Sequence, residues 1–493
     1  MFESAELGHT LDKDTWKARV PELREALLEA QLDLLEKANT AVVLVIGGIE
    51  GAGKGETVNV LNEWMDPRHI VTEAFAELSE EERQRPFMWR YWRALPPKGK
   101  IGVLFGSWYT GVVVDRVLGH SSAADLDQQI QRIRHFERML ARENVLLIKL
   151  WFHLSKKRQK RRLTELEKNP DTAWRVSEKD WKFFRHFDRF AAVSETVLRE
   201  TSTGDAPWVV IDGTEHRYRS LTAGELLLES IRKKLDQTAP VALPAPAPLL
   251  ERAALDERNV INQLDYGLSL KKKPYKDELA RWQRELSLIS RDSRFRKRNA
   301  VCVFEGNDAA GKGGAIRRIT QALDARFYRV IPIAAPTDEE RAQPYLWRFW
   351  RHLPRHGRFA LFDRSWYGRV LVERVEGLCS EHDWMRAYSE INEFEEQLVE
   401  HGTIVTKFWL AITPDEQLKR FQAREQTGYK RFKITDEDWR NRDRWPDYER
   451  AVCDMVDRTS TEYAPWTLVE ANDKRHARIR VLQTLCETFE ARL

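Results

Sequence analysis

The sequence repeats itself once, and this repeat constrains the fold more than any other feature. When AVVLVIGGIEGAGKGET (41–57) is placed above NAVCVFEGNDAAGKGGA (299–315), Lys54 falls on Lys312, an offset of 258 residues. The same offset holds without a gap for Pro86 and Pro344, Trp89 and Trp347, Ser107 and Ser365, and Trp208 and Trp466. Solenoid repeats have periods of only about 20–50 residues, so each copy is expected to fold around a core of its own.

A segment rich in proline and alanine separates the two copies. Residues 238–250, TAPVALPAPAPLL, have the composition of an extended, semi-rigid spacer. The chain of 493 residues is also longer than the roughly 100–200 residues of a typical domain. We therefore predict an N-terminal domain over residues 1–237, a linker over 238–250 and a C-terminal domain over 251–493.

Within each copy, short apolar runs rich in β-branched residues alternate with longer helical patterns. In the second copy these runs are AVCVFEG, RVIPIA, RFALFD, TIVTKFWLAI and WTLVEA. Such alternation is typical of a parallel sheet with helices on both faces. The sequence therefore predicts a doubly wound α/β protein with two tandem domains, each with a five-stranded, mostly parallel sheet. A capping box at Thr337–Glu340, repeated at Ser79–Glu82, predicts the start of a helix that carries WRFWR (347–351).

A glycine-rich loop in the second copy has the spacing of a phosphate-binding loop. It follows the apolar run AVCVFE and precedes the helical pattern AIRRITQAL. Backbone N–H groups in such a loop bind phosphate oxygens, and Lys312 adds a mobile positive charge. A simple glycine-rich turn is the weaker alternative, because strand, lysine and helix all agree. The loop residues expected to bind phosphate or nucleotide are Gly306, Asn307, Ala309, Ala310, Gly311, Lys312, Gly313 and Gly314.

One residue of this loop is unusual, because Gly313 stands where a Ser or Thr hydroxyl normally helps to hold Mg²⁺. Carboxylates are the natural replacement, since Mg²⁺ prefers oxygen ligands. The candidates are Asp308, inside the loop, and Asp363, at the end of the run RFALFD. Carboxyl ends of parallel strands meet at one edge of the sheet, so we predict a metal site at these two residues. A residue that only stabilises the turn is the alternative for Asp308.

Two arginines follow Asp363 in the segment DRSWYGR (363–369). Arg364 and Arg369 are suited to stabilising the charge on a phosphoryl group during its transfer. Arg369 is also four residues before Glu373, so the two side chains could instead form an ordinary ion pair on one helical face. The sequence leaves both interpretations open.

A basic segment lies between Lys419 and Lys433. In a P-loop kinase this segment follows the fourth strand, where a helical lid closes over the phosphates. Together with Arg348, Arg351 and Arg355 it could line a channel for a long polyanion. A solvated helix face and a nucleic-acid-binding patch are the alternatives. Its basic residues are Lys419, Arg420, Arg424, Lys430, Arg431 and Lys433.

The motifs EGNDAAGKGG (305–314), PTDEERAQPYLWRFWRHLP (336–354) and DRSWYGRVLVERV (363–375), taken together, resemble those of the family-2 polyphosphate kinases. The resemblance covers each copy almost end to end. The fused arrangement is similar to the class that makes ADP from AMP and polyphosphate. The resemblance implies a P-loop kinase-like fold with a helical lid, inorganic polyphosphate as phosphoryl donor, AMP as acceptor and a requirement for Mg²⁺.

The resemblance also implies roles for individual residues. Lys312 would bind phosphate, and Asp308 and Asp363 would act with the metal and the acceptor phosphate. Arg364 and Arg369 would stabilise the transferred group. Further contacts to phosphate or nucleotide are expected from Arg348, Glu373 and Arg374.

The first copy departs from this pattern at the residues that carry the chemistry. Asp308, Asp363, Arg364 and Arg369 are replaced there by Glu50, Phe105, Gly106 and Gly111. A phenylalanine cannot hold Mg²⁺, so the first copy is expected to be catalytically inactive. It is then retained for packing, or for guiding the polyanion through the basic run from Lys156 to Arg162.

The amino-acid composition limits the possible binding partners and the cellular compartment of the protein. The net charge of +4 says little about partners, so anion binding must come from local clusters. The four cysteines show no metal or disulfide spacing, which favours the reducing cytoplasm. The first residues lack the features of a signal peptide, and no apolar run approaches the roughly 20 residues of a membrane span. We expect a cytoplasmic homodimer that binds no membrane and no nucleic acid.

Two other functions remain open at this point. An ATP-dependent nucleoside or nucleotide kinase would use the same loop. A non-catalytic nucleotide- or RNA-binding module is the weaker alternative, because the aromatic residues are not interleaved with the basic segment.

Overall fold

The computed structural model describes residues 1–237, 258–426 and 436–493. They form two compact units, each built around one sheet. The first unit contains Met1–Leu78, the chain from Arg90 to the end of the first half, and Pro336–Trp347. The second contains Ser79–Trp89 and the rest of the described chain. The predicted linker lies outside the described residues, so the predicted domain boundaries stay a prediction.

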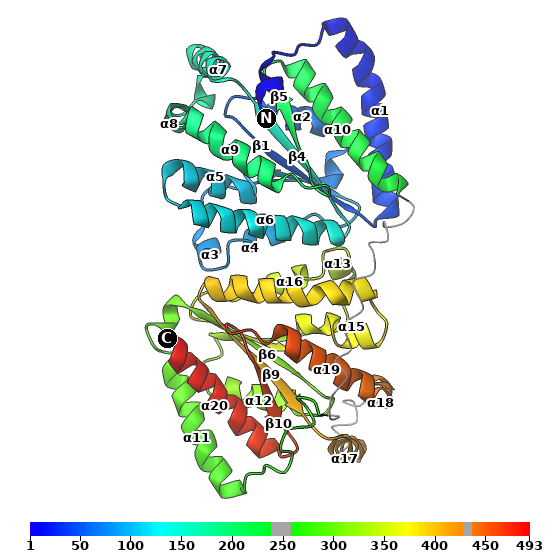
Figure 1. Cartoon of the computed structure of the whole chain (residues 1–493), viewed down its shortest axis with the longest axis vertical. Coiled ribbons are helices and arrows are strands. Elements are labelled where there is room, and N and C mark those ends of the chain that lie inside the picture. Colours follow the sequence, from blue (N-terminus) through cyan, green and yellow to red (C-terminus); the bar gives the residue numbers. More distant parts are fainter. Residues whose placement is uncertain (238–257, 427–435) are drawn as a thin grey trace. The chain divides into compact units, whose positions relative to one another are not determined.

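The first half of the chain carries a parallel sheet with the strand order β2-β3-β1-β4-β5. Helices α1 and α10 lie on one face of this sheet, and α5, α6 and α9 lie on the other (Figure 1). The strands are β1 (Ala41–Gly48), β2 (Ile70–Ala74), β3 (Ile101–Phe105), β4 (Val145–His153) and β5 (Trp208–Asp212). The α-helices are α1 (Lys13–Lys37), α2 (Lys54–Trp64), α3 (Glu80–Arg83), α4 (Trp89–Arg93), α5 (Trp108–Leu118), α6 (Ala123–Arg142), α7 (Lys156–Lys168), α8 (Glu178–Arg185), α9 (Phe187–Thr201) and α10 (His216–Asp236). Short 3-10 helices are η1 (Glu3–Glu6), η2 (Pro67–His69) and η3 (Ala173–Arg175).

The second half repeats this topology with the strand order β7-β8-β6-β9-β10, again all parallel. Helices α11, α12 and α20 pack together on one face, and α16 and α19 pack together on the other. The strands are β6 (Asn299–Gly306), β7 (Tyr328–Pro332), β8 (Phe359–Asp363), β9 (Thr403–Ala411) and β10 (Trp466–Glu470). The α-helices are α11 (Lys272–Ile289), α12 (Lys312–Thr320), α13 (Asp338–Arg341), α14 (Trp347–Trp350), α15 (Val372–Val375), α16 (Glu381–Glu400), α17 (Pro414–Glu425), α18 (Asp436–Asp443), α19 (Trp445–Thr459) and α20 (Lys474–Arg492). Short 3-10 helices are η4 (Phe295–Lys297) and η5 (Trp366–Arg369).

The predicted α/β class, the five strands of each copy and their parallel arrangement are confirmed. The central strands are mostly apolar because helices cover both faces of the sheet, and β6 and β9 are buried at nearly every position. The strand order places β6 between β8 and β9, so the loops that follow β6 and β8 start side by side. This edge of the sheet carries the glycine-rich loop and Asp363.

The capping boxes form as predicted, but the helix that they open is shorter than expected. Thr337 and Glu340 exchange hydrogen bonds at the start of α13, which ends at Arg341. The WRFWR segment lies in a separate helix, α14. Pro344 stands between them, and a proline has no N–H to continue a helix. The prediction of one helix carrying both was therefore wrong, and the first copy has the same break around Pro86.

Within the described chain, no helix combines the length and the apolar character needed to cross a lipid bilayer.

Candidate active site

The glycine-rich loop of the second copy connects β6 to α12, as the sequence predicts. Lys312 is the first residue of α12, and its ammonium group donates to the backbone oxygen of Gly306 at 2.6 Å. Gly306 has φ = 149°, and a Cβ there would lie 2.4 Å from the carbonyl oxygen of Leu410. Only glycine fits this position. The loop therefore wraps tightly around the lysine at the N-terminus of α12, which is the arrangement that binds phosphate.

Asp308 lies at the centre of a polar network beside this loop. One of its carboxylate oxygens is 3.3 Å from Nη2 of Arg364, and the other accepts a hydrogen bond of 2.9 Å from Nδ2 of Asn441. Tyr448 in turn donates to Oδ1 of Asn441 at 3.1 Å. Burial raises the pKa of Tyr448, so this hydroxyl stays a donor at any neutral pH. The network directs the Asp308 carboxylate toward Arg364 and Asn441.

Asp363 and Arg364 follow β8 at the same edge of the sheet. Asp363 is paired in register with Phe304 of β6, and the N–H of Arg364 donates to the Phe304 carbonyl at 3.0 Å. The structure thus brings Asp363 to the strand that carries the phosphate loop. Burial lowers the pKa of Arg364, but the surrounding carboxylates outweigh burial and the net shift is upward. These carboxylates are Asp308, Glu305, Glu437 and Asp363.

Glu305 is a second buried carboxylate at this edge, and the sequence analysis missed it. The residue is 5% exposed and accepts a hydrogen bond of 2.8 Å from the hydroxyl of Ser365. Burial raises the pKa of the Glu305 carboxyl, while Lys312 acts in the opposite direction. A single charged residue at the end of an otherwise apolar strand was the signal that could have identified it.

Arg369 and Glu373 form an ion pair with 2.8 Å between Nε and Oε2. The two residues do not lie on one helix, however. Arg369 ends η5, Glu373 belongs to α15, and Leu371 between them has ψ = −98°. The expectation of a single helical face was wrong, whereas the first copy does form one regular helix, α5, at this place.

The remaining arginines of the prediction lie in different surroundings. Arg348 is 8% exposed and donates to the backbone oxygen of Ala334 at 3.0 Å. Arg374 is 2.8 Å from Asp454 and stacks over the ring of Trp384 at 4.2 Å. Neither of these two arginines lines the cavity formed by the loop, Arg364 and helices α17 to α19.

Of the basic segment, the structure describes only the first part. Arg420 is 5% exposed and donates to the carbonyl oxygens of Ala309 and Ala310, both at 2.9 Å. It therefore clamps the phosphate loop from behind. Lys419 is largely exposed and Arg424 is partly exposed. Lys430, Arg431 and Lys433 lie outside the described residues.

The cavity beside the loop is where phosphoryl chemistry can occur. Its lining includes Glu305, Asp308, Arg364, Asn441 and Tyr448. Asn441 lies in the polar helix α18 and Tyr448 in α19, and no sequence signal indicates that Asn441 contacts Asp308.

Comparison with known proteins explains this arrangement. The family described as polyphosphate kinase 2 matches residues 10–239 and 269–493. A polyphosphate:AMP phosphotransferase of Pseudomonas aeruginosa is 58% identical over 100% of this chain and 99% of its own length. Another, from Acinetobacter johnsonii, is 39% identical over 94% of this chain and 95% of its own. The chain belongs to the polyphosphate kinase 2 family.

The fold agrees with this assignment. A crystal structure of a putative polyphosphate kinase 2 from Pseudomonas aeruginosa PA01 superposes with a TM-score of 0.90 at 56% identity, covering 100% of this chain and 99% of that one. Both copies of the polyphosphate kinase 2 fold are therefore present in one chain, as the internal repeat predicts.

In the first copy of this polyphosphate kinase 2 fold, an internal carboxylate sits beside the phosphate loop. Lys54 donates to the Gly48 carbonyl at 2.9 Å, which repeats the geometry of Lys312. Glu56, however, stands where the second copy has Gly314, and it pairs with three guanidinium groups. These belong to Arg162, Arg175 and Arg219. Three arginines near this loop thus share one carboxylate of the protein itself.

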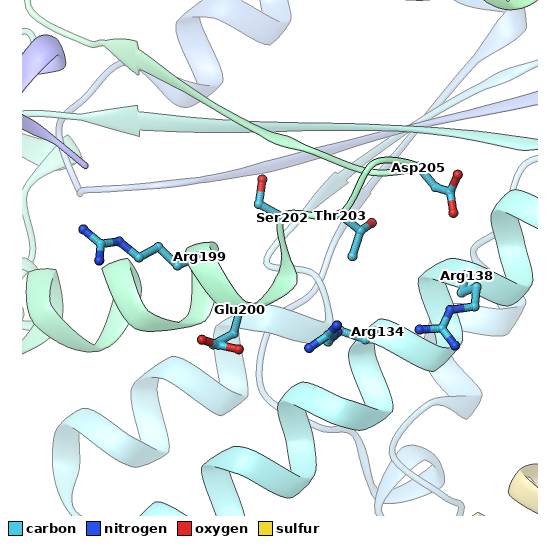
Figure 2. A pocket seen from close by; sticks show the side chains of 7 residues that line it. All are labelled: Arg134, Arg138, Arg199, Glu200, Ser202, Thr203 and Asp205. Carbon is cyan, nitrogen blue, oxygen red and sulfur yellow. The ribbon is translucent and has the colours of Figure 1, made fainter.

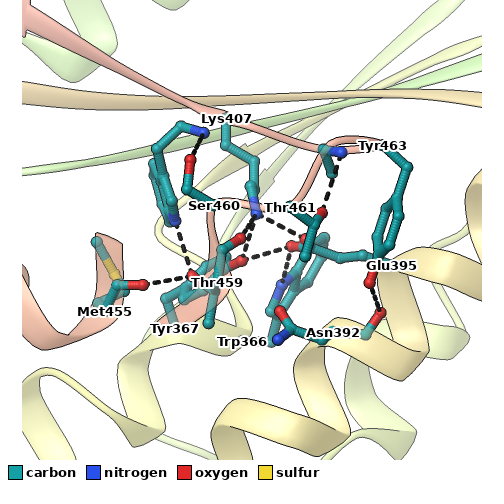
Figure 3. Close-up of polar contacts among 12 residues, drawn as sticks. Trp366, Tyr367, Asn392, Glu395, Lys407, Met455, Thr459, Ser460, Thr461 and Tyr463 are labelled. Atoms are coloured by element: carbon teal, nitrogen blue, oxygen red, sulfur yellow. Dashed lines mark hydrogen bonds and ion pairs between the residues drawn. The ribbon is translucent and has the colours of Figure 1, made fainter. Parts of the chain in front are cut away.

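Both copies also share a buried polar network that is independent of the catalytic residues. In the second copy, Lys407 is 2.7 Å from Glu395, and this carboxylate accepts hydrogen bonds from Trp366 at 3.0 Å and Tyr367 at 2.7 Å (Figure 3). Lys149 and Glu137 repeat the pair at 2.7 Å in the first copy. Because the network persists where Asp363, Arg364 and Arg369 are absent, we assign it to packing of the segment after the third strand.

Proposed function

We propose that this chain transfers the terminal phosphoryl group of inorganic polyphosphate to AMP and so forms ADP. One observation carries the proposal. The second copy places a phosphate loop, Asp308 and the Asp363–Arg364 segment at one sheet edge, on a chain 58% identical over its full length to a polyphosphate:AMP phosphotransferase. An ATP-dependent kinase would use the same loop, so the donor is the point to be tested.

The residues of this edge suit a transfer between two phosphates. A phosphate monoester has a second pKa of about 6, so the acceptor phosphate of AMP is ionised at neutral pH and needs no general base. Its oxygen forms a new bond to the terminal phosphorus while the terminal P–O–P bridge breaks. The shortened polyphosphate leaves as an anion. Lys312 and Arg364 stabilise the charge on the group that moves.

The donor set at this edge fits a divalent metal, and we assign Mg²⁺ to it. No cluster of three or more metal-binding side chains occurs among residues 1–237, 258–426 and 436–493. Mg²⁺ commonly needs only one or two carboxylates, because substrate phosphates supply further ligands. Asp308 and Asp363 would hold it. When bound, the ion neutralises phosphate charge and aligns donor and acceptor.

The second copy carries all turnover in this proposal, and the first copy, residues 1–237, is inactive. Glu50, Phe105, Gly106 and Gly111 replace its reactive groups, and Glu56 occupies the arginines near its loop.

Assembly and compartment complete the proposal. We assign the chain to the cytoplasm, since Cys302, Cys379, Cys453 and Cys486 are all free thiols. We also assign it a homodimeric state, the commonest closed assembly of soluble enzymes. Light scattering that gives the mass of one chain, 57.9 kDa, at micromolar concentrations would contradict the dimer.

A donor assay tests the activity. Purified protein is incubated with AMP, Mg²⁺ and either long-chain polyphosphate or ATP, and ADP is quantified by chromatography. We expect ADP with polyphosphate, and removal of the metal by a chelator should stop its formation. ADP formed with ATP but not with polyphosphate would instead identify an ATP-dependent kinase. RNA binding without turnover would identify the non-catalytic alternative.

A further inference from the structure

The first copy contains a polar cavity away from its phosphate loop. It lies where α6 faces the end of α9 and the turn before β5, and it has a volume of about 460 Å³, within the range of ligand sites (Figure 2). Three arginines line it: Arg134 and Arg138 from α6, and Arg199 from α9. The phosphate chemistry of the second copy does not involve this cavity.

Two of these arginines have no counter-ion of their own. Within the described residues, Arg134 and Arg138 form no hydrogen bond or ion pair, and Nε of Arg134 is buried without a partner. Arg199 pairs with Glu195 at 2.7 Å. A buried guanidinium nitrogen without an acceptor costs free energy, so an anionic ligand in this cavity would satisfy it.

Hydroxyl groups complete the lining. The oxygens of Ser202 and Thr203 already accept hydrogen bonds from the backbone N–H groups of Trp208 and Ala206. Their own O–H groups therefore remain available as donors. The lining also contains two carboxylates, Glu200 and Asp205. Burial lowers the pKa of Lys234, and the nearby Asp205 carboxylate acts against this shift, so Asp205 already has a cationic neighbour.

In the second copy, a side chain fills the position equivalent to this cavity. Arg134 and Asp205 correspond to Asn392 and Tyr463. Tyr463 reaches across to α16 and donates to the backbone oxygen of Asn392 at 2.9 Å (Figure 3). A tyrosine therefore fills the gap that an aspartate leaves open in the first copy.

Charge differs between the copies in the same direction. Arg138 and Arg199 correspond to Glu396 and Asp457, whereas Glu200 corresponds to Arg458. The charged positions of the lining and their counterparts therefore sum to +1 in the first copy and −1 in the second. The opening and the positive charge thus occur together, in the copy that has lost its reactive residues.

From this cavity we infer that the first copy binds a run of phosphate groups of inorganic polyphosphate, as a second, non-catalytic donor site. Guanidinium groups match phosphate oxygens in geometry and charge. No aromatic or aliphatic side chain lines the cavity, so it offers no surface on which a nucleotide base could stack. The inference rests on the proposed function, because polyphosphate is the donor there. The first copy then retains the polymer while the second shortens it.

The test compares full-length variants for binding and for turnover. Tripolyphosphate, orthophosphate and AMP are titrated into the protein by calorimetry, and KM is measured for long polyphosphate and for AMP. The double variant Arg134→Gln/Arg138→Gln should weaken tripolyphosphate binding and raise the KM for long polyphosphate about tenfold, the value of one charged hydrogen bond. Its KM for AMP should not change.

Two further variants make the result specific. Asp205→Tyr should close the cavity as Tyr463 does, and should reproduce the loss. Lys13→Gln/Lys17→Gln removes two exposed charges from α1, outside the cavity, and should behave as wild type. Circular dichroism confirms that each variant is folded.

Several outcomes would overturn the inference. One is that the double arginine variant keeps the wild-type affinity for tripolyphosphate and the wild-type KM for long polyphosphate. The others are that this variant loses affinity only for orthophosphate, or only for AMP. Wild-type turnover in the same preparation separates the two proposals. If wild-type protein does not use polyphosphate, the proposed function fails; if it does and the variants match it, only the cavity assignment fails.

Discussion

Arg364 and Gly106 occupy equivalent positions in the two copies, and both have φ = 65°. Glycine adopts this left-handed region freely, whereas a side chain there costs roughly 1–2 kcal/mol. The second copy accepts this cost at the residue whose guanidinium group reaches Asp308. The strained backbone occurs in the copy that has Asp308 and Asp363, and glycine relieves it in the copy that lacks them. This indicates that Arg364 is retained for the action of its guanidinium group.

This relationship predicts that two substitutions at position 364 have the same effect on turnover but different effects on stability. Arg364→Gly and Arg364→Ala should both lower kcat at least about a hundredfold, because each removes a cation from the phosphoryl group. Only glycine relieves the strain, so Arg364→Gly should be more stable to urea than Arg364→Ala by about 1 kcal/mol. Gly106→Ala should lower stability without affecting turnover. Equal stability of the two Arg364 variants would show that the backbone is unstrained.

The division of labour between the copies predicts unequal effects of matched loop substitutions. Lys312→Ala should lower kcat at least about a hundredfold, and Asp363→Asn should act alike through loss of a metal ligand. Lys54→Ala alters the same geometry in a copy without Asp363 and Arg364, and should keep most of kcat. The measurement is kcat for the three variants in parallel, with urea unfolding as the control for folding. Comparable losses for Lys54→Ala and Lys312→Ala would mean that both loops work.

Most of the fold could be predicted because its determinants are local or repeated. The five apolar runs of the second copy became β6 to β10, and the repeat carried the same topology to the first. Predictions failed where a single residue interrupts a pattern. Pro344 separates α13 from α14, and the unusual backbone at Leu371 separates η5 from α15. Pro344 was a visible signal that the helical spacing overrode, whereas nothing in the sequence marks the backbone at Leu371.

Only those residues of the candidate site that belong to a recognisable sequence motif could be predicted. The loop and the DRSWYGR segment were recognisable, and the sheet brings them together. Asn441 donates to Asp308 from a helix 133 residues later in the chain, Tyr448 donates to Asn441, and no local pattern marks either residue. Arg420 belongs to a basic segment but is buried against loop carbonyls, which charge patterning cannot reveal.

The buried network predicts equal losses of stability in both copies. Lys407 and Glu395 are fully buried, and burial lowers the pKa of Lys407. Lys407→Met leaves the Glu395 carboxylate buried without its cation and should cost about 3–5 kcal/mol. Lys149→Met should lower stability similarly, while the folded fraction keeps wild-type kcat.

Urea unfolding followed by fluorescence measures the free energy of unfolding of these variants, with the double variant Lys407→Met/Glu395→Gln as control. The double variant removes both charges and should recover part of the loss. No loss in Lys149→Met would contradict a packing role for the network.

The phosphate loop has a titratable neighbour that predicts a pH dependence of polyphosphate use. Lys474 begins α20, and burial together with the nearby Arg420 lowers its pKa to about 8. The Arg420 guanidinium that lowers this pKa also donates to the loop carbonyls of Ala309 and Ala310. Below pH 8 the amine is charged and attracts a phosphate chain, and above pH 8 this attraction is lost.

We therefore expect the KM for polyphosphate to rise by up to about fivefold between pH 7 and pH 9, since an exposed charge pair contributes at most about 1 kcal/mol. Lys474→Met should have the higher KM at both pH values and a flat profile, whereas Lys276→Met, on the exposed side of α11, should keep the wild-type profile. Unfolding cannot explain the rise. The folded state has the lower pKa, so it favours the neutral amine, and this group adds stability as the pH increases through 8. Thermal unfolding at both pH values checks this point, and a wild-type profile in Lys474→Met would place the titrating group elsewhere.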